Sequence, residues 1–134
     1  MIDLENDIFT AVATALRTAH SGIFVTGEYV DAPPSFPAVS IIEGGNSVAQ
    51  RYRTTKIENA VAVMYEVNIY SNKASGKKSE AKAIADTVDT VFESIGFTRT
   101  MRNQVANFND ATIYRIVCRY EAIIDKDFWV YQNL

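Results

Sequence analysis

Two residues of the chain belong to the types that most often act as nucleophiles, bases or soft metal ligands: one histidine, His20, and one cysteine, Cys118. Thiol catalysis needs a nearby base, and zinc sites take several imidazoles or thiolates. Almost a hundred residues separate the two, and the chain has no second histidine. We expect His20 to lie near a helix C-terminus and Cys118 to be a small buried hydrophobe, rather than a ligand and a nucleophile.

A phosphate-binding loop is not supported either. Residues 76–79 read Gly-Lys-Lys-Ser, but a P-loop needs a glycine five residues before its Gly-Lys pair and a hydroxyl directly after the lysine. Ser71 and Lys78 occupy those two positions, and the chain contains no G-x-G-x-x-G sequence. The resemblance to a P-loop is therefore spurious.

Two pairs of acids, Asp86 with Asp89 and Asp125 with Asp127, could in principle supply a general acid and base. The first pair lies off the apolar stripe of its predicted helix, and exposed acids rarely have the raised pKa that general-acid catalysis needs. We interpret both pairs as solvated surface. The sequence thus predicts a protein that is not an enzyme, with no catalytic residue, metal or cofactor.

Charge is distributed unevenly along the chain. The net charge is −3, but residues 1–43 hold six acids and a single base, and residues 44–82 hold seven bases and three acids. Most of these bases form two groups: Arg51, Arg53 and Lys56, and Lys73, Lys77 and Lys78. The groups are too small and too far apart to predict a nucleic-acid site. Tyr52 lies between two arginines, so this trio either clamps a partner or anchors its own loop.

The totals indicate one folded domain over residues 1–134. The chain is 48% apolar and 22% charged, with three prolines and six glycines, which is ordinary globular composition. A single cysteine excludes an internal disulfide and fits synthesis in a reducing cytoplasm. The apolar run that includes residues 61–65 is far shorter than the ~20 residues of a membrane span, so we expect no membrane association.

Hydrophobic periodicity predicts an α+β protein. Residues 4–19 and the stripe from Ile84 to Ile95 have helical spacing, with Asp3 as N-cap of the first helix and Gly96 as the end of the second. Strands are predicted at 23–26, 38–43, 61–70, 98–105 and 112–125, with a short edge strand at 128–131. The order α-β-β-β-α-β-β indicates a mixed or antiparallel sheet with both helices on one face.

Two of the predicted strands have further distinctive features. Gly44-Gly45-Asn46 is expected to break the second strand and to begin a mobile loop that reaches residue 59. In the strand 112–125, one face alternates apolar residues, and the other carries Arg115, Arg119 and Glu121. Such a mixed-charge face is a candidate subunit boundary, and so is the loop with Arg51, Tyr52, Arg53 and Lys56.

Residues 65–97, YEVNIYSNKASGKKSEAKAIADTVDTVFESIGF, join an alternating strand to an amphipathic helix through a lysine-bearing turn. This passage resembles the strand, polar turn and helix of the tail terminator (tail-completion) proteins of long-tailed bacteriophages and prophages. The resemblance extends loosely over the whole chain, through the order of helices and strands, and includes no invariant motif.

That resemblance implies a structural virion protein that forms a homohexameric ring at the head-proximal end of the tail. One face would dock on the tail-tube protein and the other on a neck or head-completion protein, while DNA passes through without being read. The nearest alternative is another head-tail connector, neck or minor capsid protein. From a different class, the alternative is a small monomeric ligand-binding or enzymatic α+β domain, which a pocket with convergent polar groups would favour.

Overall fold

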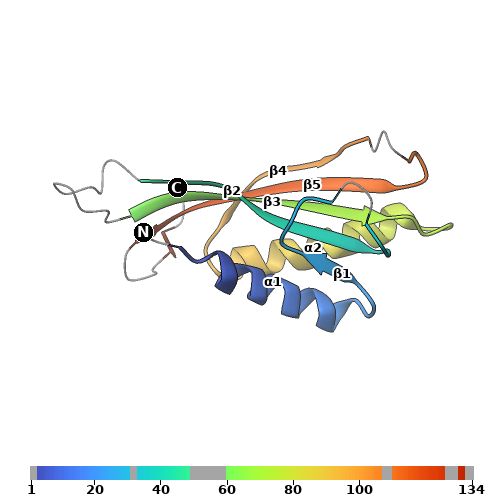
Figure 1. Cartoon of the computed structure of the whole chain (residues 1–134), viewed down its shortest axis with the longest axis horizontal. Coiled ribbons are helices and arrows are strands. Elements are labelled where there is room, and N and C mark those ends of the chain that lie inside the picture. Colours follow the sequence, from blue (N-terminus) through green and yellow to red (C-terminus); the bar gives the residue numbers. More distant parts are fainter. Residues whose placement is uncertain (1–2, 31–32, 49–59, 107–109, 126–129, 132–134) are drawn as a thin grey trace.

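The computed structural model of the chain describes residues 3–30, 33–48, 60–106, 110–125 and 130–131. The molecule has two layers, a long twisted sheet and a pair of helices that both pack on the same face of it (Figure 1). The elements in chain order are α1 (Glu5–Ala19), β1 (Phe24–Thr26), β2 (Ala38–Val48), β3 (Ala60–Ser71), α2 (Lys77–Ser94), β4 (Thr98–Gln104), β5 (Tyr114–Asp125) and β6 (Val130–Tyr131). The predicted α+β class and element order are confirmed.

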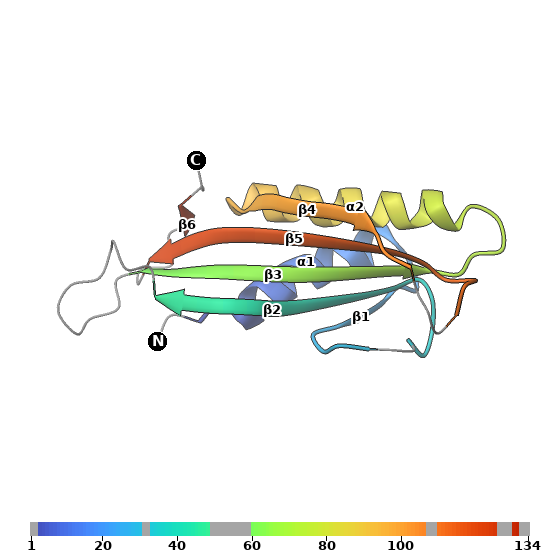
Figure 2. The same ribbon diagram turned by 90° about the horizontal axis from the view of Figure 1, so that it is seen from above.

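The sheet has the strand order β1-β2-β3-β5-β4, and β6 pairs with the end of β5. All neighbours are antiparallel except β1 and β2, which run parallel over three residues of each strand. Figure 2 views the sheet from the side opposite the helices and shows β3 at its centre, between β2 and β5. Short β6 corresponds to the end of the predicted edge strand at 128–131.

Alternation along β3 places one set of side chains against the helices. The odd-numbered residues from Val61 to Ile69 are each at most 4% exposed, as the period-2 pattern predicts. They meet the apolar stripes of the two helices, which consist of Ile8, Val12 and Leu16 from α1 and Ala81, Ile84, Ala85, Val88 and Phe92 from α2. This layer between sheet and helices is the hydrophobic core.

The first helix begins one residue later than predicted. Leu4 holds the N-cap position without a side-chain cap, while the Asp3 carboxylate accepts a hydrogen bond of 3.0 Å from the Glu5 backbone N–H. At the other end, His20 Nε2 lies 2.9 Å from Thr87 Oγ1 and so connects the two helices. Neither helix in the described part of the chain has the length and apolarity required to cross a bilayer.

The prediction that residues 44–46 break the second strand is wrong. β2 continues to Val48, and a β-bulge between Glu43 and Gly45 absorbs one extra residue in the pairing with β3. Gly44 is the residue inserted, and a Cβ there would lie 2.6 Å from Met64 Cε. The two glycines therefore permit a bulge within β2 and do not end the strand. The rest of the loop predicted to be mobile, residues 49–59, lies outside the described residues.

Gly96 ends α2 in the predicted left-handed conformation, with a φ of 92°. The Phe97 N–H then donates to the Phe92 carbonyl at 2.9 Å, and the two rings make an edge contact with centroids 5.2 Å apart. This is the expected glycine-terminated helix end with its hydrophobic contact. It directs the chain into β4.

Replacing Gly96 with alanine is expected to lower the free energy of unfolding by about 1–2 kcal/mol, because L-residues resist positive φ. Gly45→Ala is the matched control, since a Cβ at Gly45 meets nothing closer than Met64 Cβ at 4.0 Å. Urea denaturation of both variants measures the difference. Equal stabilities would contradict the assigned helix end.

Candidate assembly interface

The sheet face that the helices leave uncovered, here called the open face, carries the charged residues predicted on β5. Cross-strand register assigns its residues: Ser40 and Ile42 on β2; Ala62, Met64, Glu66, Asn68 and Tyr70 on β3; Arg115, Val117, Arg119, Glu121 and Ile123 on β5; Met101 on β4. Figure 2 looks directly onto this face. The predicted alternation along β5 is therefore confirmed, although Val117 on this face is also buried.

A polar network crosses the centre of the open face. Arg119 donates from Nε and Nη2 to Glu66 Oε1, at 3.2 and 3.1 Å. Asn68 donates to the other oxygen of Glu66 at 3.4 Å and accepts from Arg115 Nε and Nη2 at 3.1 and 2.6 Å. Both arginines predicted to pair across a subunit boundary thus have partners within their own chain.

The two ends of this network differ in exposure. Asn68 is fully buried and Tyr70 is 3% exposed, and the Arg115 guanidinium lies 5.7 Å from the Tyr70 ring centroid. The Arg119 and Glu66 side chains remain 46% and 26% exposed. The Arg115 end is therefore closed, and the Arg119 end faces solvent.

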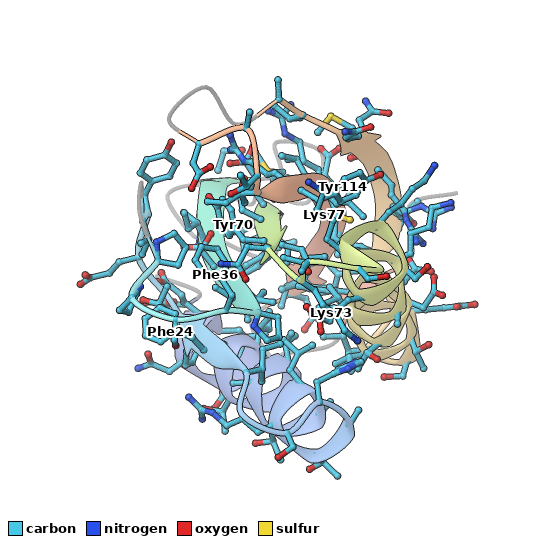
Figure 3. The ribbon with its side chains drawn as sticks, turned by 90° about the vertical axis from the view of Figure 1, so that its right-hand side faces the viewer. Phe24, Phe36, Tyr70, Lys73, Lys77 and Tyr114 are labelled. Carbon is cyan, nitrogen blue, oxygen red and sulfur yellow. The ribbon has the colours of Figure 1, made fainter. Side chains whose placement is uncertain are left out.

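The segment between β1 and β2 accounts for this closure. Tyr70 donates its hydroxyl hydrogen to the Val30 carbonyl at 3.4 Å, and Pro33 of the same segment is buried. Figure 3 views the molecule from this end, with Tyr70 and Phe36 labelled. Ser40, 1% exposed, has no hydrogen-bond partner for its hydroxyl among the described residues. The described residues leave the other half of the open face available to a partner.

The available half combines apolar surface with a charged border. A shallow hollow of about 270 Å³ lies over β2, β3 and β5, lined in part by Gly45, Met64 and Ile123, with Glu121 at its edge. Ala62 is exposed, and Met64 and Ile123 are half-buried. An apolar centre with a polar rim is the usual composition of a protein–protein interface. Of the predicted interface residues, Arg119 and Glu121 lie here, while Arg51, Tyr52, Arg53 and Lys56 lie outside the described residues.

On the helix side of the sheet, the Asp86 side chain is 71% exposed, as predicted, but both acids of α2 have partners and Asp89 is partly buried. Asp86 accepts from Arg102 at 2.9 Å, and Asp89 accepts from Arg99 at 3.2 Å and from the Tyr120 hydroxyl at 3.1 Å. Asp89 retains 28% exposure of its side chain. The pairs fix β4 to α2. Sequence spacing gave no signal for them, because they depend on how β4 returns along the helix.

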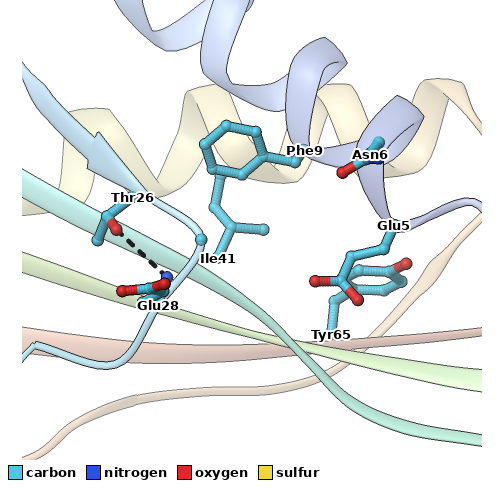
Figure 4. Close-up of a pocket in the computed structure, with 8 residues that line it drawn as sticks. Glu5, Asn6, Phe9, Thr26, Glu28, Ile41 and Tyr65 are labelled. Carbon is cyan, nitrogen blue, oxygen red and sulfur yellow. Dashed lines mark hydrogen bonds between the residues drawn. The ribbon is translucent and has the colours of Figure 1, made fainter.

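A second hollow, of about 380 Å³, opens between the start of α1, the end of β1 and the edge of β2 (Figure 4). Its lining residues are Glu5, Asn6, Phe9, Thr26, Gly27, Glu28, Ile41 and Tyr65. Beside it, ligand oxygens of Asp3, Glu5 and Glu43 all lie within 4.8 Å of one another. We call this hollow the edge pocket. Sequence reasoning missed it because it joins residues from four separate elements.

Burial and charge shift the proton affinities beside the edge pocket. Burial, followed by repulsion from Glu5 and Asp3, raises the pKa of Glu43, although the 3.1 Å hydrogen bond from Tyr65 opposes the shift. Burial and the neighbouring Glu43 carboxylate raise the pKa of Tyr65, so this phenol stays protonated and donates. The pocket therefore has a negative rim over an apolar floor.

The predicted roles of the reactive residues agree with their surroundings. Cys118 is fully buried, and burial raises the pKa of its thiol, which disfavours the nucleophilic thiolate. Lys77, from the Gly-Lys-Lys-Ser sequence, begins α2 and donates to the Thr112 carbonyl at 3.2 Å. Within the described part of the chain, these groups form no nucleophile and base pair with His20.

Comparison with known proteins shows a shared fold. No protein-family model matches the sequence, and no curated protein matches it. Among solved structures, a chain from the "Virion of native gene transfer agent (GTA) particle" superposes with a TM-score of 0.61 and 18% sequence identity. The match covers 87% of this chain and 93% of that one. The two chains therefore share their architecture nearly from end to end.

Proposed function

We propose that the chain is a structural subunit of a phage-type virion, and specifically a tail terminator. It assembles with copies of itself into a ring, most simply a hexamer, at the head-proximal end of the tail. The ring docks on the tail-tube protein and on a neck or head-completion protein, and DNA crosses it without sequence-specific contact. The observation that carries the proposal is the fold shared with a virion chain over almost its entire length.

The available half of the open face supports an assembly role. It presents Met64 and Ile123 next to the exposed Arg119–Glu66 pair and Glu121, and neither helix covers it. Partly accessible apolar side chains bordered by charge are typical of a docking surface. The surroundings of Cys118 and His20 favour a non-enzymatic protein.

Addition of the purified chain to isolated phage tail tubes tests the proposal. Negative-stain images should show a ring on one end of each tube, and light scattering after size-exclusion chromatography should give the number of subunits. A monomer in free solution is compatible with the proposal if tubes are capped. Tubes that stay uncapped at high protein concentration would reject it.

The alternative function is that of another neck or connector protein of the virion, and the same shared fold supports this alternative. The two possibilities differ in which partner binds directly. A tail terminator should sediment with tail tubes in the absence of heads, whereas a neck protein should sediment with DNA-filled heads in the absence of tails.

A further inference from the structure

The edge pocket exists because β1 leaves the sheet early. β1 pairs with β2 only as far as Thr26 opposite Ser40, and the chain turns away at Gly27. From Ile41 onward, the described residues place no strand on that edge of β2. The pocket occupies the space next to this uncovered edge, as Figure 4 shows with Ile41 beneath Phe9. The pocket therefore lies at the sheet edge, where β1 no longer pairs with β2, and is not a packing defect of the core.

The chemistry of the pocket favours a cationic, planar occupant. Half-buried Phe9 provides the accessible aromatic surface, above a floor of Ile41 and Tyr65 that are 3% and 1% exposed. The charged residues that line the pocket, Glu5 and Glu28, are both exposed acids. A guanidinium matches this combination, because it pairs with carboxylates through a planar fork and stacks on aromatic rings.

We propose that the edge pocket receives the basic segment 51–56 of a second copy of the chain. This segment holds Arg51, Arg53 and Lys56 together with Tyr52, and no acid. The lysine group around the start of α2 is a poorer fit, since it has no guanidinium and Lys77 already donates to the Thr112 carbonyl. The contact rests on the proposed assembly and would join an acidic surface of one subunit to a basic segment of the next.

Chain geometry favours a second copy over the same chain. Seven residues of β2 separate Ile41 from Val48, which is about 23 Å at strand spacing. The three residues from Val48 to Arg51 span at most about 11 Å. In its own subunit the Arg51 backbone therefore stays at least about 12 Å from Ile41, and only Arg53 and Lys56 have enough chain to fold back to the pocket. A neighbouring subunit has no such limit, and a head-to-tail contact of this kind uses two different surfaces of each copy.

Reciprocal charge reversal tests the contact. Glu5→Arg with Glu28→Arg reverses the pocket rim, and Arg51→Glu with Arg53→Glu reverses the segment. Each double variant should self-associate roughly tenfold more weakly than the parent in sedimentation velocity, because like charges then meet. A mixture of the two should recover association, since reversed segment and reversed rim are again complementary. Lys73→Glu with Lys78→Glu, both exposed, is the matched control and should associate as the parent does.

A synthetic peptide of residues 48–59 tests binding to the pocket independently, without any substitution in the segment. It should bind the parent and lose binding to the pocket variant, measured by fluorescence anisotropy, with circular dichroism to confirm that the variant is folded. Unchanged association after rim reversal would overturn the proposal, and so would a parent that neither self-associates nor binds the peptide. Tail capping is scored separately: subunits that associate through the pocket yet cap no tubes refute the terminator function alone.

Discussion

Replacing Phe92 with alanine is expected to lower the free energy of unfolding by about 3–5 kcal/mol, the usual cost of removing a buried aromatic side chain. Phe92 is 0% exposed and stacks on Tyr120 with ring centroids 4.2 Å apart and planes 6° from parallel. It also contacts Phe97 and Tyr65, at centroid distances of 5.2 and 6.0 Å. The truncation therefore opens a cavity where α2, β3 and β5 meet. Urea unfolding followed by circular dichroism measures the loss.

Phe24→Ala provides the comparison for this variant. Phe24 lies on the three-residue strand β1 at the sheet edge and is only half-buried. Its truncation should cost about 1–2 kcal/mol, because partly exposed side chains lose less burial and leave no closed cavity. If the two variants are equally stable, the aromatic cluster is not the centre of the core.

Arg119→Glu is expected to leave the subunit folded and to abolish capping of tail tubes. In the free subunit the Arg119–Glu66 pair is exposed and contributes no more than about 1 kcal/mol. At a subunit boundary the same pair would be partly desolvated, and the loss of one partner costs about 2–5 kcal/mol of binding. The variant also places three carboxylates on one face, since Glu66 pairs with position 119 across the strands and Glu121 lies two residues further along β5. Circular dichroism and negative-stain counts of capped tubes measure the two effects.

Arg17→Glu is the matched control for that variant. Arg17 is exposed in the last turn of α1, on the helix layer, and the substitution makes the same change in net charge. It should leave capping unchanged. If Arg119→Glu also caps tubes as the parent does, the open face is a solvated surface and the interface lies elsewhere.

The spacing of apolar residues was sufficient to predict the elements that bury one regular face against the core. The odd-numbered residues of β3 and the stripe of α2 both face the core, and each pattern continues long enough to identify its element. The glycine end of α2 was also predictable, because Gly96 stands directly after the stripe and Phe97 repeats its apolar character. Local sequence therefore supplied the fold class and the charged face of β5.

Sequence reasoning failed where pairing with a distant strand overrides a local preference. Gly44-Gly45 predicted the end of a strand, but β3 offers partners on both sides of the bulge and holds the chain in the ladder. The same reason explains why Asp89 was assigned to solvent, since Arg99 and Tyr120 reach it from other strands. The edge pocket had no signal at all, because it depends on where β1 stops.

The buried thiol of Cys118 can serve as a natural probe of transient opening of the core. It is the only thiol in the sequence, and it lies at the middle of β5 with 0% exposure. A thiol reagent can reach it only when the structure around it opens, so the rate of labelling reports how often this part of the core opens. In a multi-subunit particle, denaturant would disrupt every component at once. Labelling kinetics would instead show whether neighbours slow the opening of this subunit in place.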